Sequence, residues 1–150
     1  MEAPGFGRAT NTLAPKETEV ELPFGAYRLL PDAQRRVFIA TGTRLAPFLP
    51  MFAAMAAAGQ LDTAELYFGC STAKDDITHI FSPLPRTTAC VSRDPSAEGV
   101  LRGRVTEPLA KLNFDPLTTH FYLCGSAAMV AECRSILARA GAMQVLTEPF

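Results

Sequence analysis

Residues 37–47 read VFIATGTRLAP, and this stretch decides the fold. The run 37–41 is rich in β-branched and apolar residues, which is typical of a buried strand. Gly42 then permits a sharp turn, and Pro47 is tolerated in a first helical turn, where its missing N–H would have had no partner. The next apolar residues are spaced i, i+3, i+4 and i+7, as on one helix face: Phe48, Met51, Phe52 and Met55. A strand, a glycine turn and an amphipathic helix are therefore expected.

The alternation of strand and helix continues to the end of the chain. Short runs rich in β-branched or aromatic residues predict five strands: 37–41, 65–69, 87–91, 120–124 and 144–147. The clearest later helix begins after Ser126, a good N-cap, and stops near Gly141. Weaker helical patterns cover 74–81 and 104–112, where right-handed crossovers need helices. The pattern predicts an α/β fold: a doubly wound, Rossmann-like, five-stranded parallel sheet with helices on both faces.

Composition limits the classes of function. Hydrophobic residues make up 48% of the chain and charged residues 19%, as in a folded globular domain. A net charge of -1 provides no general attraction to nucleic acid or to an anionic membrane, and neither is expected as a partner. The four cysteines form no CxxC pair and no histidine stands at a zinc-ligand spacing, so no metal site is predicted. Nothing near the start resembles a secretory signal, and a cytoplasmic protein is expected.

Candidate ligand-binding residues follow the predicted strands, because ligands of open α/β sheets bind beyond the carboxyl ends of the strands. The first such turn contains Gly42 and Thr43, and the helix behind it begins with unpaired N–H groups that attract phosphate. A glycine turn after a strand is also a common structural feature. The order of the other motifs along the chain is therefore needed to choose between these interpretations.

Four motifs, in order, resemble those of the ferredoxin–NADP reductase family. Residues 37–48 resemble the signature that opens the family's pyridine-nucleotide domain, and 67–71, YFGCS, resemble its second strand. Residues 124–130, CGSAAMV, are similar to its fourth strand-to-helix turn, and 148–150, EPF, match its ending on an aromatic residue with a carboxylate two positions earlier. The resemblance implies an NAD(P)H-dependent flavoprotein reductase. Such an enzyme transfers hydride from NADPH to FAD, and electrons pass on to a ferredoxin-like or oxygenase partner.

The resemblance also implies roles for individual residues. Those expected to position the nicotinamide against the flavin, and so to be catalytic, are Thr43, Cys124, Glu148 and Phe150. None of them needs to act as an acid or base, because hydride transfer depends on holding two rings in contact. The residues expected to bind the cofactors are Thr10, Gly42, Thr43, Arg44, Pro47, Gly69, Cys70, Ser92, Arg93, Arg104, Gly125 and Met129. The alternative interpretation gives these residues no functional role. Cys124 would then be a small apolar residue at a strand end, and Phe150 would be a residue of the C-terminal tail.

Ser92 and Arg93 favour NADPH over NADH. A guanidinium grips a 2′-phosphate with paired charge-assisted hydrogen bonds, and a serine hydroxyl adds another donor. By its resemblance to bacterial members that use NADPH, the region implies Arg93 and Arg104 as the phosphate pair. Asp94 favours an unphosphorylated ribose, so NADH stays an alternative. Arg104 has the further interpretation of a solvated residue at a helix start.

The chain departs from the family in its first part. A flavin-binding barrel of about a hundred residues does not fit into residues 1–35. We expect this segment to be a linker or the end of such a barrel, in which Gly7, Thr10 and Asn11 resemble the pyrophosphate turn, and residues 36–150 to form the NAD(P)-binding domain. FAD is not expected to be retained by this chain alone, so a flavin domain in the same or another chain is implied. The alternative function is a non-catalytic nucleotide-binding or regulatory module that has lost its flavin domain.

Arg44 is the second departure, because the family usually has glycine or another small residue there. A long cation at this position can obstruct the path of the pyrophosphate, or it can pair with a phosphate. The sequence supports both interpretations equally.

Overall fold

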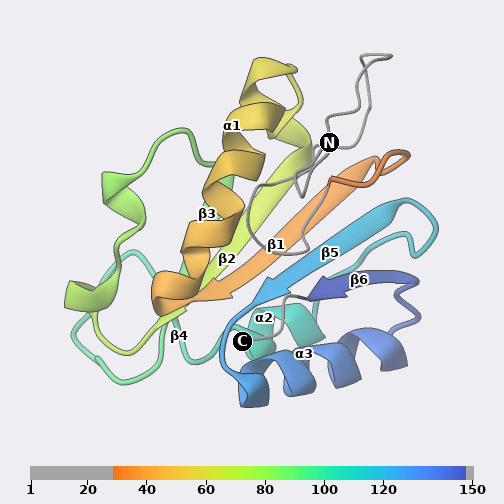
Figure 1. Ribbon diagram of the computed structural model, residues 1–150. Coiled ribbons are helices and arrows are strands. Elements are labelled where there is room, and N and C mark those ends of the chain that lie inside the picture. Colours follow the sequence, from red (N-terminus) through yellow and green to blue (C-terminus); the bar gives the residue numbers. More distant parts are fainter. Residues whose placement is uncertain (1–28, 148–150) are drawn as a thin grey trace.

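A parallel β-sheet forms the centre of the computed structural model, which describes residues 29–147 (Figure 1). Its strands are β1 (Arg35–Thr41), β2 (Ala64–Cys70), β3 (Arg86–Val91), β4 (Leu101–Arg102), β5 (Thr119–Cys124) and β6 (Gln144–Thr147). They lie in the order β4-β3-β2-β1-β5-β6, and all neighbours are parallel. The chain moves from β1 to one edge and then returns to the other side of β1, as in a doubly wound sheet. The predicted Rossmann-like α/β fold is confirmed.

All five predicted strands are present, with some ends extended by one or two residues. The sixth strand, β4, is an addition that was not predicted. It pairs Leu101 with Cys90 and Arg102 with Val91 at the edge of the sheet. Two residues are too few to show an alternating pattern, so the sequence contains no strand signal at this position.

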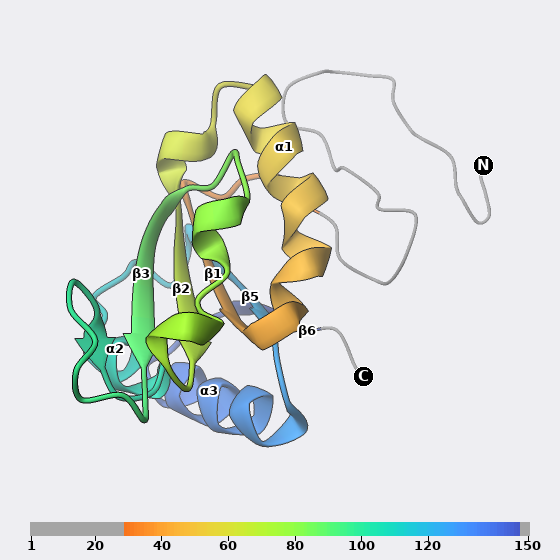
Figure 2. The same ribbon diagram turned by 90° about the vertical axis from the view of Figure 1, so that its left-hand side faces the viewer.

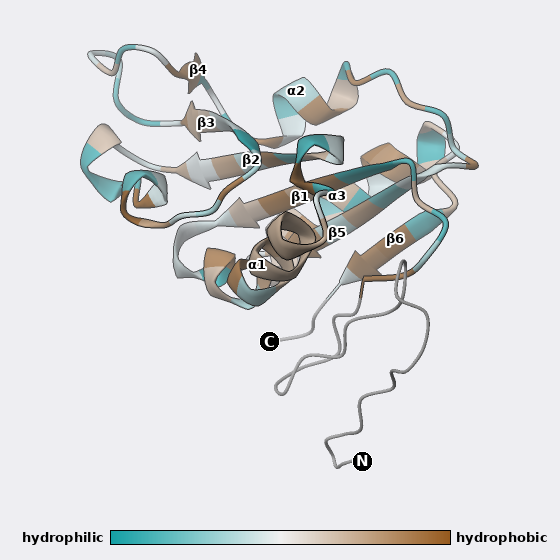
Figure 3. Ribbon diagram, turned by 90° about the horizontal axis from the view of Figure 1, so that it is seen from above, coloured by the Kyte–Doolittle hydropathy of each residue, from teal (hydrophilic) through white to brown (hydrophobic). Residues whose placement is uncertain are grey.

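Helices cover both faces of the sheet (Figures 1 and 2). One face is covered by α1 (Leu49–Ala57), and the other by α2 (Thr106–Ala110) and α3 (Ala127–Arg139). Strand β1 contributes to both cores: Phe38 packs in the cluster with α1 and Val37 in the cluster with α2 and α3, each with 0% exposure. Successive strand residues point to opposite faces, so the continuous apolar run 37–40 in this central strand requires cover on both sides. The hydrophobic residues of the central strands are coloured brown in Figure 3.

The segment after the glycine turn begins with a 3-10 helix, Gly42–Phe48, before α1. The predicted apolar stripe is buried, with exposures of 1% or less: Phe48, Met51, Phe52 and Met55. Phe38 lies against two of these rings, with its centroid 5.0 Å from that of Phe48 and 4.8 Å from that of Phe52. The stripe therefore anchors the glycine turn from below.

The helix predicted after Ser126 is present as α3. The Ser126 hydroxyl accepts a hydrogen bond from the Met129 N–H at 3.2 Å, which satisfies one of the donors exposed at a helix start. The helix ends at Arg139, and Gly141 follows with a φ of 90°. The capping signals in the sequence therefore located this helix at both ends.

The two weaker helical patterns form less helix than expected. Within 104–112 only the five residues of α2 are α-helical, and 74–81 contains two short 3-10 turns instead. Asp76 explains part of this difference: its carboxylate accepts hydrogen bonds from the Thr78 N–H and hydroxyl at 3.0 and 2.6 Å. Such side-chain bonds compete with the backbone bonds of a continuous helix.

A partly buried ion pair joins strands at the amino end of the sheet. Arg35 donates two hydrogen bonds to the Glu65 carboxylate, at 2.6 and 3.1 Å, and a third to the Asn113 carbonyl at 2.8 Å. The Tyr67 hydroxyl donates to the same carboxylate at 3.3 Å, and Arg86 lies 3.7 Å from it. The hydrogen bond to Glu65 raises the pKa of Arg35. We call these residues, Arg35, Glu65, Tyr67 and Arg86, the amino-end cluster.

Next to this cluster, side chains from β1 and β5 hold the segment that enters the sheet. Arg36 donates to the Leu30 carbonyl at 2.6 Å, and the Leu30 N–H donates to the Tyr122 hydroxyl at 3.3 Å. His120 is paired with Arg36 in the strand register and is 5% exposed. Burial, and then the positive charge of Arg36, lower the pKa of His120. The side chains of Arg36 and His120 are therefore buried rather than exposed at an open site.

Several expectations concern residues beyond those the structure describes. The pyrophosphate-turn resemblance at Gly7, Thr10 and Asn11 lies in this part of the chain, as do Glu148 and Phe150. The proposed boundary near residue 35 is likewise untested by the described residues. Within residues 29–147, no helix is both long and apolar enough to cross a membrane.

Candidate functional site

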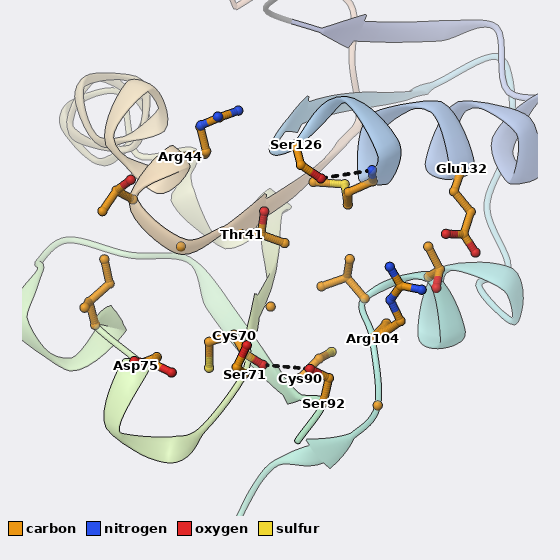
Figure 4. Close-up of a pocket in the computed structure, with 18 of the residues that line it drawn as sticks. Thr41, Arg44, Cys70, Ser71, Asp75, Cys90, Ser92, Arg104, Ser126 and Glu132 are labelled. Atoms are coloured by element: carbon orange, nitrogen blue, oxygen red, sulfur yellow. Dashed lines mark hydrogen bonds between the residues drawn. The ribbon is translucent and has the colours of Figure 1, made fainter. Parts of the chain in front are cut away.

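A cavity of about 690 Å³ opens at the carboxyl ends of the central strands (Figure 4). Residues at or just after β1, β2, β3, β4 and β5 contribute to its wall, together with the first turns of α2 and α3. The lining residues are Thr41, Gly42, Thr43, Arg44, Gly69, Cys70, Ser71, Lys74, Asp75, Ile77, Cys90, Ser92, Gly103, Arg104, Val105, Thr106, Ser126, Met129 and Glu132. The cavity lies where the strand order reverses, which is the ligand position expected for an open α/β sheet.

Most of the predicted cofactor-binding residues line this one cavity. They come from five separate segments of the chain: Gly42, Thr43 and Arg44; Gly69 and Cys70; Ser92; Arg104; and Met129. The sheet brings these segments together because the carboxyl ends of its parallel strands share one edge. The convergence makes the cavity the candidate site.

Other predicted residues lie near the cavity without lining it. Cys124 ends β5 and is 0% exposed, packed in the core cluster on the α1 side. Gly125 is buried just beyond it, and Pro47 is half-buried within the 3-10 helix. Arg93 is exposed, and its backbone N–H donates to the Ser71 carbonyl at 2.8 Å. Thr10, Glu148 and Phe150 are outside the described residues.

The glycine turn owes its shape to Gly42. This residue has a φ of 58°, a left-handed backbone conformation that costs free energy for residues with a Cβ. A Cβ added there would meet no atom within 4 Å, so the backbone conformation rather than space favours glycine. Leu45 and Phe48 are buried beneath the turn and hold it against the sheet. The backbone of Gly42 and Thr43 is thereby presented to the cavity.

Arg44 crosses from this turn to the turn after β5. Its Nη1 donates a hydrogen bond of 2.5 Å to the carbonyl of Gly125. In Figure 4 the guanidinium extends toward the side of the cavity where Ser126 begins α3. Arg44 therefore spans the two strand ends, β1 and β5, between which the strand order reverses.

Gly125 is enclosed on its other side. A Cβ added at this position would lie 2.1 Å from Cε of Met129 and 2.8 Å from Oγ1 of Thr41. Both separations are far below a normal van der Waals contact, so only glycine fits without movement of its neighbours. The predicted Gly125 thus has a close-packing role, and its contacts bring Met129 to the cavity wall.

The loop after β3 is organised by Asp94. Its carboxylate accepts hydrogen bonds from the Ala73 N–H at 3.1 Å and from the Ser96 N–H and hydroxyl at 3.1 and 2.7 Å. These bonds, with the Ser96 hydroxyl first, lower the pKa of Asp94. Arg102 adds bonds to the carbonyls of Pro95 and Ala97. Both carboxylate oxygens of Asp94 thus accept hydrogen bonds that shape this loop.

The cavity wall combines charges of both signs with small apolar groups. Lys74 and Arg104 supply positive charge, whereas Asp75 and Glu132 supply negative charge. Burial raises the pKa of Cys70 and Cys90 to about 11, so both thiols stay protonated at neutral pH and act as small, unreactive lining groups. Among residues 29–147 no group of histidine, cysteine and carboxylate side chains could hold a metal ion.

Sequence reasoning missed several lining residues. Thr41 and Ser71 lie next to predicted residues at strand ends, and the strand-end rule would have found them. Ser126 was recognised as a helix cap but not as part of the site. Lys74 and Glu132 lie on a loop and in a helix, and no local signal indicates that these segments return to the cavity.

The geometry is suited to a long ligand with anionic and apolar parts. The first turn of α3 begins at the cavity, and N–H groups at a helix start, with the helix dipole, favour an anion. Lys74 and Arg104 add cationic groups, while Met129, Ile77 and the two thiols offer apolar surface. A nucleotide has both kinds of group.

Comparison with known proteins identifies a family model over most of the sequence. The model described as "Oxidoreductase NAD-binding domain" matches residues 38–135. This range contains the last four residues of β1, all of β2 to β5, the helices between them and all of the cavity lining. No curated protein matches the chain.

Three solved structures share the fold. A ferredoxin NADP+ reductase from Neisseria gonorrhoeae with bound FAD and NADP is 24% identical with a TM-score of 0.67, over 79% of this chain and 56% of that one. The flavohem-like FAD/NAD-binding domain of a nitric oxide dioxygenase from Vibrio cholerae is 21% identical with a TM-score of 0.73, over 85% and 55%. The Amycolatopsis cytochrome P450 reductase GcoB is 23% identical with a TM-score of 0.67, over 79% and 38%. The chain thus corresponds to little more than half of each of the first two.

Proposed function

This chain belongs to the oxidoreductase NAD-binding domain family, and from that premise we propose that it binds NADPH in the cavity at the sheet edge and delivers its hydride to FAD. The FAD is held by a flavin domain in the same or another chain. Electrons then pass to a ferredoxin-like or oxygenase partner. The observation that carries the proposal is the convergence of predicted residues from five chain segments on one cavity.

The glycine turn and the start of α3 support binding of a dinucleotide. Gly42 and Thr43 present backbone at one wall, and the first turn of α3 begins at another. Phosphate groups are stabilised where helix N–H groups and a helix dipole converge. The pyrophosphate of the nucleotide is therefore assigned to the space between these two elements.

Three residues support NADPH over NADH. Ser92 and Arg104 line the cavity, and Arg93 follows Ser92 on the exposed loop. Two guanidinium groups and a hydroxyl would supply paired, charge-assisted hydrogen bonds to a 2′-phosphate. Since Asp94 is engaged in shaping the loop, no opposing carboxylate is assigned to the ribose. NADH is expected to bind more weakly.

Hydride transfer requires the nicotinamide to lie near Cys124. In this proposal Thr43 and Cys124 position the ring, and Glu148 and Phe150 complete the edge that meets the flavin. FAD supplies the hydride acceptor when it is bound, and the residues of this chain orient the donor ring and exclude water. In this proposal residues 36–150 are the NAD(P)-binding domain, and residues 1–35 are a linker or the end of a flavin-binding barrel. We do not expect residues 1–150 to retain FAD alone.

The complete burial of Cys124 favours a second candidate function. Cys124 is 0% exposed, and if the nicotinamide cannot reach it, the chain binds the nucleotide without transferring hydride. The chain would then be a nucleotide-binding or regulatory module. Such a module would bind the nucleotide but would not reduce flavin, even when a flavin domain is supplied.

Calorimetric titration of the full chain with NADPH, NADH and FAD, each added separately, tests the proposal. We expect NADPH to bind more tightly than NADH, and FAD to bind weakly or not at all. Binding of no nucleotide would overturn the proposed function. Addition of a flavin domain then separates the two candidates, because only the reductase module oxidises NADPH when FAD is present.

A further inference from the structure

Cys124 is separated from the cavity by the structure around Gly125. Arg44 lines the cavity, whereas its hydrogen-bond partner Gly125 and the neighbouring Cys124 do not. Cys124 is 0% exposed although it ends a strand at the same sheet edge. A ligand in the cavity therefore does not reach Cys124 in the arrangement that the structure describes.

Two sets of contacts surround Gly125, which links Cys124 to the cavity-lining Ser126. On one side, Met129 and Thr41 pack against Gly125 so tightly that a single added carbon would lie 2.1 and 2.8 Å from their atoms. On the other side, the half-buried Arg44 side chain holds the Gly125 carbonyl at 2.5 Å. The hydrogen bond joins residues 81 positions apart in the sequence, from the turns after β1 and β5.

We propose that Arg44 is a bar between two parts of the nucleotide site: an open part for the adenosine phosphates and a closed part for the nicotinamide beside Cys124. The proposal rests on the proposed function, because it assigns the two ends of one dinucleotide. The nicotinamide end reaches Cys124 only after Arg44 releases the Gly125 carbonyl. Arg44 is in this sense a positioning residue, which sets how much of the nucleotide the chain accepts.

The energetics follow from the contact that must be broken. A hydrogen bond from a charged donor is worth more than one between neutral groups, and its loss opposes entry of the nicotinamide. A fragment that carries only the adenosine end stays in the open cavity and does not disturb the bond. The affinity of the whole dinucleotide is therefore reduced relative to that of the fragment.

Binding of NADP+ and of 2′,5′-ADP to the full chain and to Arg44→Ala tests this proposal. We expect Arg44→Ala to increase affinity for NADP+ by about tenfold, the equivalent of 1.4 kcal/mol, and to leave affinity for 2′,5′-ADP unchanged. Arg139→Ala removes the same charge from an exposed position on α3 outside the cavity and should change neither affinity. If Arg44→Ala binds NADP+ no more tightly than the unaltered chain, the proposed role of Arg44 is overturned. Weaker binding would favour the alternative that Arg44 holds a phosphate.

Thiol alkylation located by mass spectrometry provides a readout that does not depend on nucleotide. We expect Arg44→Ala to accelerate labelling of Cys124 and to leave labelling of Cys133, which is 0% exposed on the buried face of α3, unchanged. Faster labelling of both cysteines indicates general loosening and counts against the bar, as does no change at Cys124. Absence of 2′,5′-ADP binding to the unaltered chain overturns the proposed function. If 2′,5′-ADP binds but Arg44→Ala and the unaltered chain bind NADP+ equally, only the role of Arg44 is overturned.

Discussion

At the amino end of the sheet Arg35 and Glu65 bind each other through two hydrogen bonds, whereas at the carboxyl end Lys74, Arg104 and Glu132 face a cavity. Within residues 29–147 the structure pairs none of the latter three side chains with a hydrogen-bonding or charged partner. The Glu65 side chain is 8% exposed, and Glu132 is exposed. Charges that are matched inside the protein contribute to stability, and charges that face a cavity are available to a ligand.

This contrast places stability and binding at opposite ends of the same strands. Strand β2 shows it within a few residues: Glu65, near its start, holds the amino-end cluster, and Cys70, its last residue, lines the cavity. Substitutions at the two ends should therefore have separable effects, and each test below compares them.

The largest expected effect is at Glu65. Glu65→Gln leaves the Arg35 guanidinium without its charged partner, and we expect a loss of about 2 kcal/mol in the free energy of unfolding, with a melting temperature lower by about 4–8 °C. Glu132→Gln, at the cavity, should leave stability unchanged and strengthen NADPH binding slightly, because a negative charge near the phosphates is removed. Calorimetric melting and nucleotide titration measure the two effects. A reduced melting temperature for Glu132→Gln would contradict the division between the two ends.

Arg93 tests whether the loop after β3 selects the cofactor. Arg93→Ala should weaken NADPH binding by about tenfold, because a charge-assisted contact to the 2′-phosphate is lost, and leave NADH binding nearly unchanged. Titration with both nucleotides measures this difference. Equal weakening of the two would show that Arg93 does not recognise the 2′-phosphate.

Gly42 and Gly59 form a matched pair for the glycine turn. Both have positive φ values, 58° and 70°, and a Cβ at either would meet no atom within 4 Å. Alanine at each position should lower the free energy of unfolding by about 1 kcal/mol. Only Gly42→Ala should also weaken NADPH binding, since Gly59 lies beyond α1 and outside the cavity. Equal nucleotide affinities for the two variants would remove the turn from the site.

The smallest effect is a pH dependence at the amino end. Burial lowers the pKa of His120, so the unfolded chain binds a proton more readily than the folded protein. Stability is therefore retained above the unfolded value of about 6.5 and declines as the pH falls below it. Denaturant unfolding at a series of pH values should show a shallower decline for His120→Gln than for the unaltered chain. His79→Gln changes an exposed histidine and should leave the decline of stability with pH as steep as in the unaltered chain. A shallower decline for His79→Gln than for His120→Gln would contradict the role assigned to His120.

The position of the cavity was predictable because it follows from a rule about strand ends. Residues 37–47 predicted a strand and a glycine turn, and parallel strands place all such turns at one edge. The remaining features depend on tertiary structure. Arg44 could be recognised as unusual from the sequence, but its acceptor, the Gly125 carbonyl, is brought near only by the pairing of β1 with β5. Glu132 reaches the cavity only because α3 packs where it does, and no local pattern encodes that position.

The pairing of β1 with β5 also has a consequence for how the chain folds. The register joins Arg35 to Thr119, so most of the domain must be synthesised before this ladder can form. Closing such a long loop carries an entropic penalty that local contacts do not offset, and folds rich in distant contacts form slowly. On the ribosome, β1, β2 and β3 would emerge and collapse with one side of β1 still unpaired. The emergence of β5 then pairs the free side of β1, α3 completes the wall of the cavity, and β6 joins the sheet last.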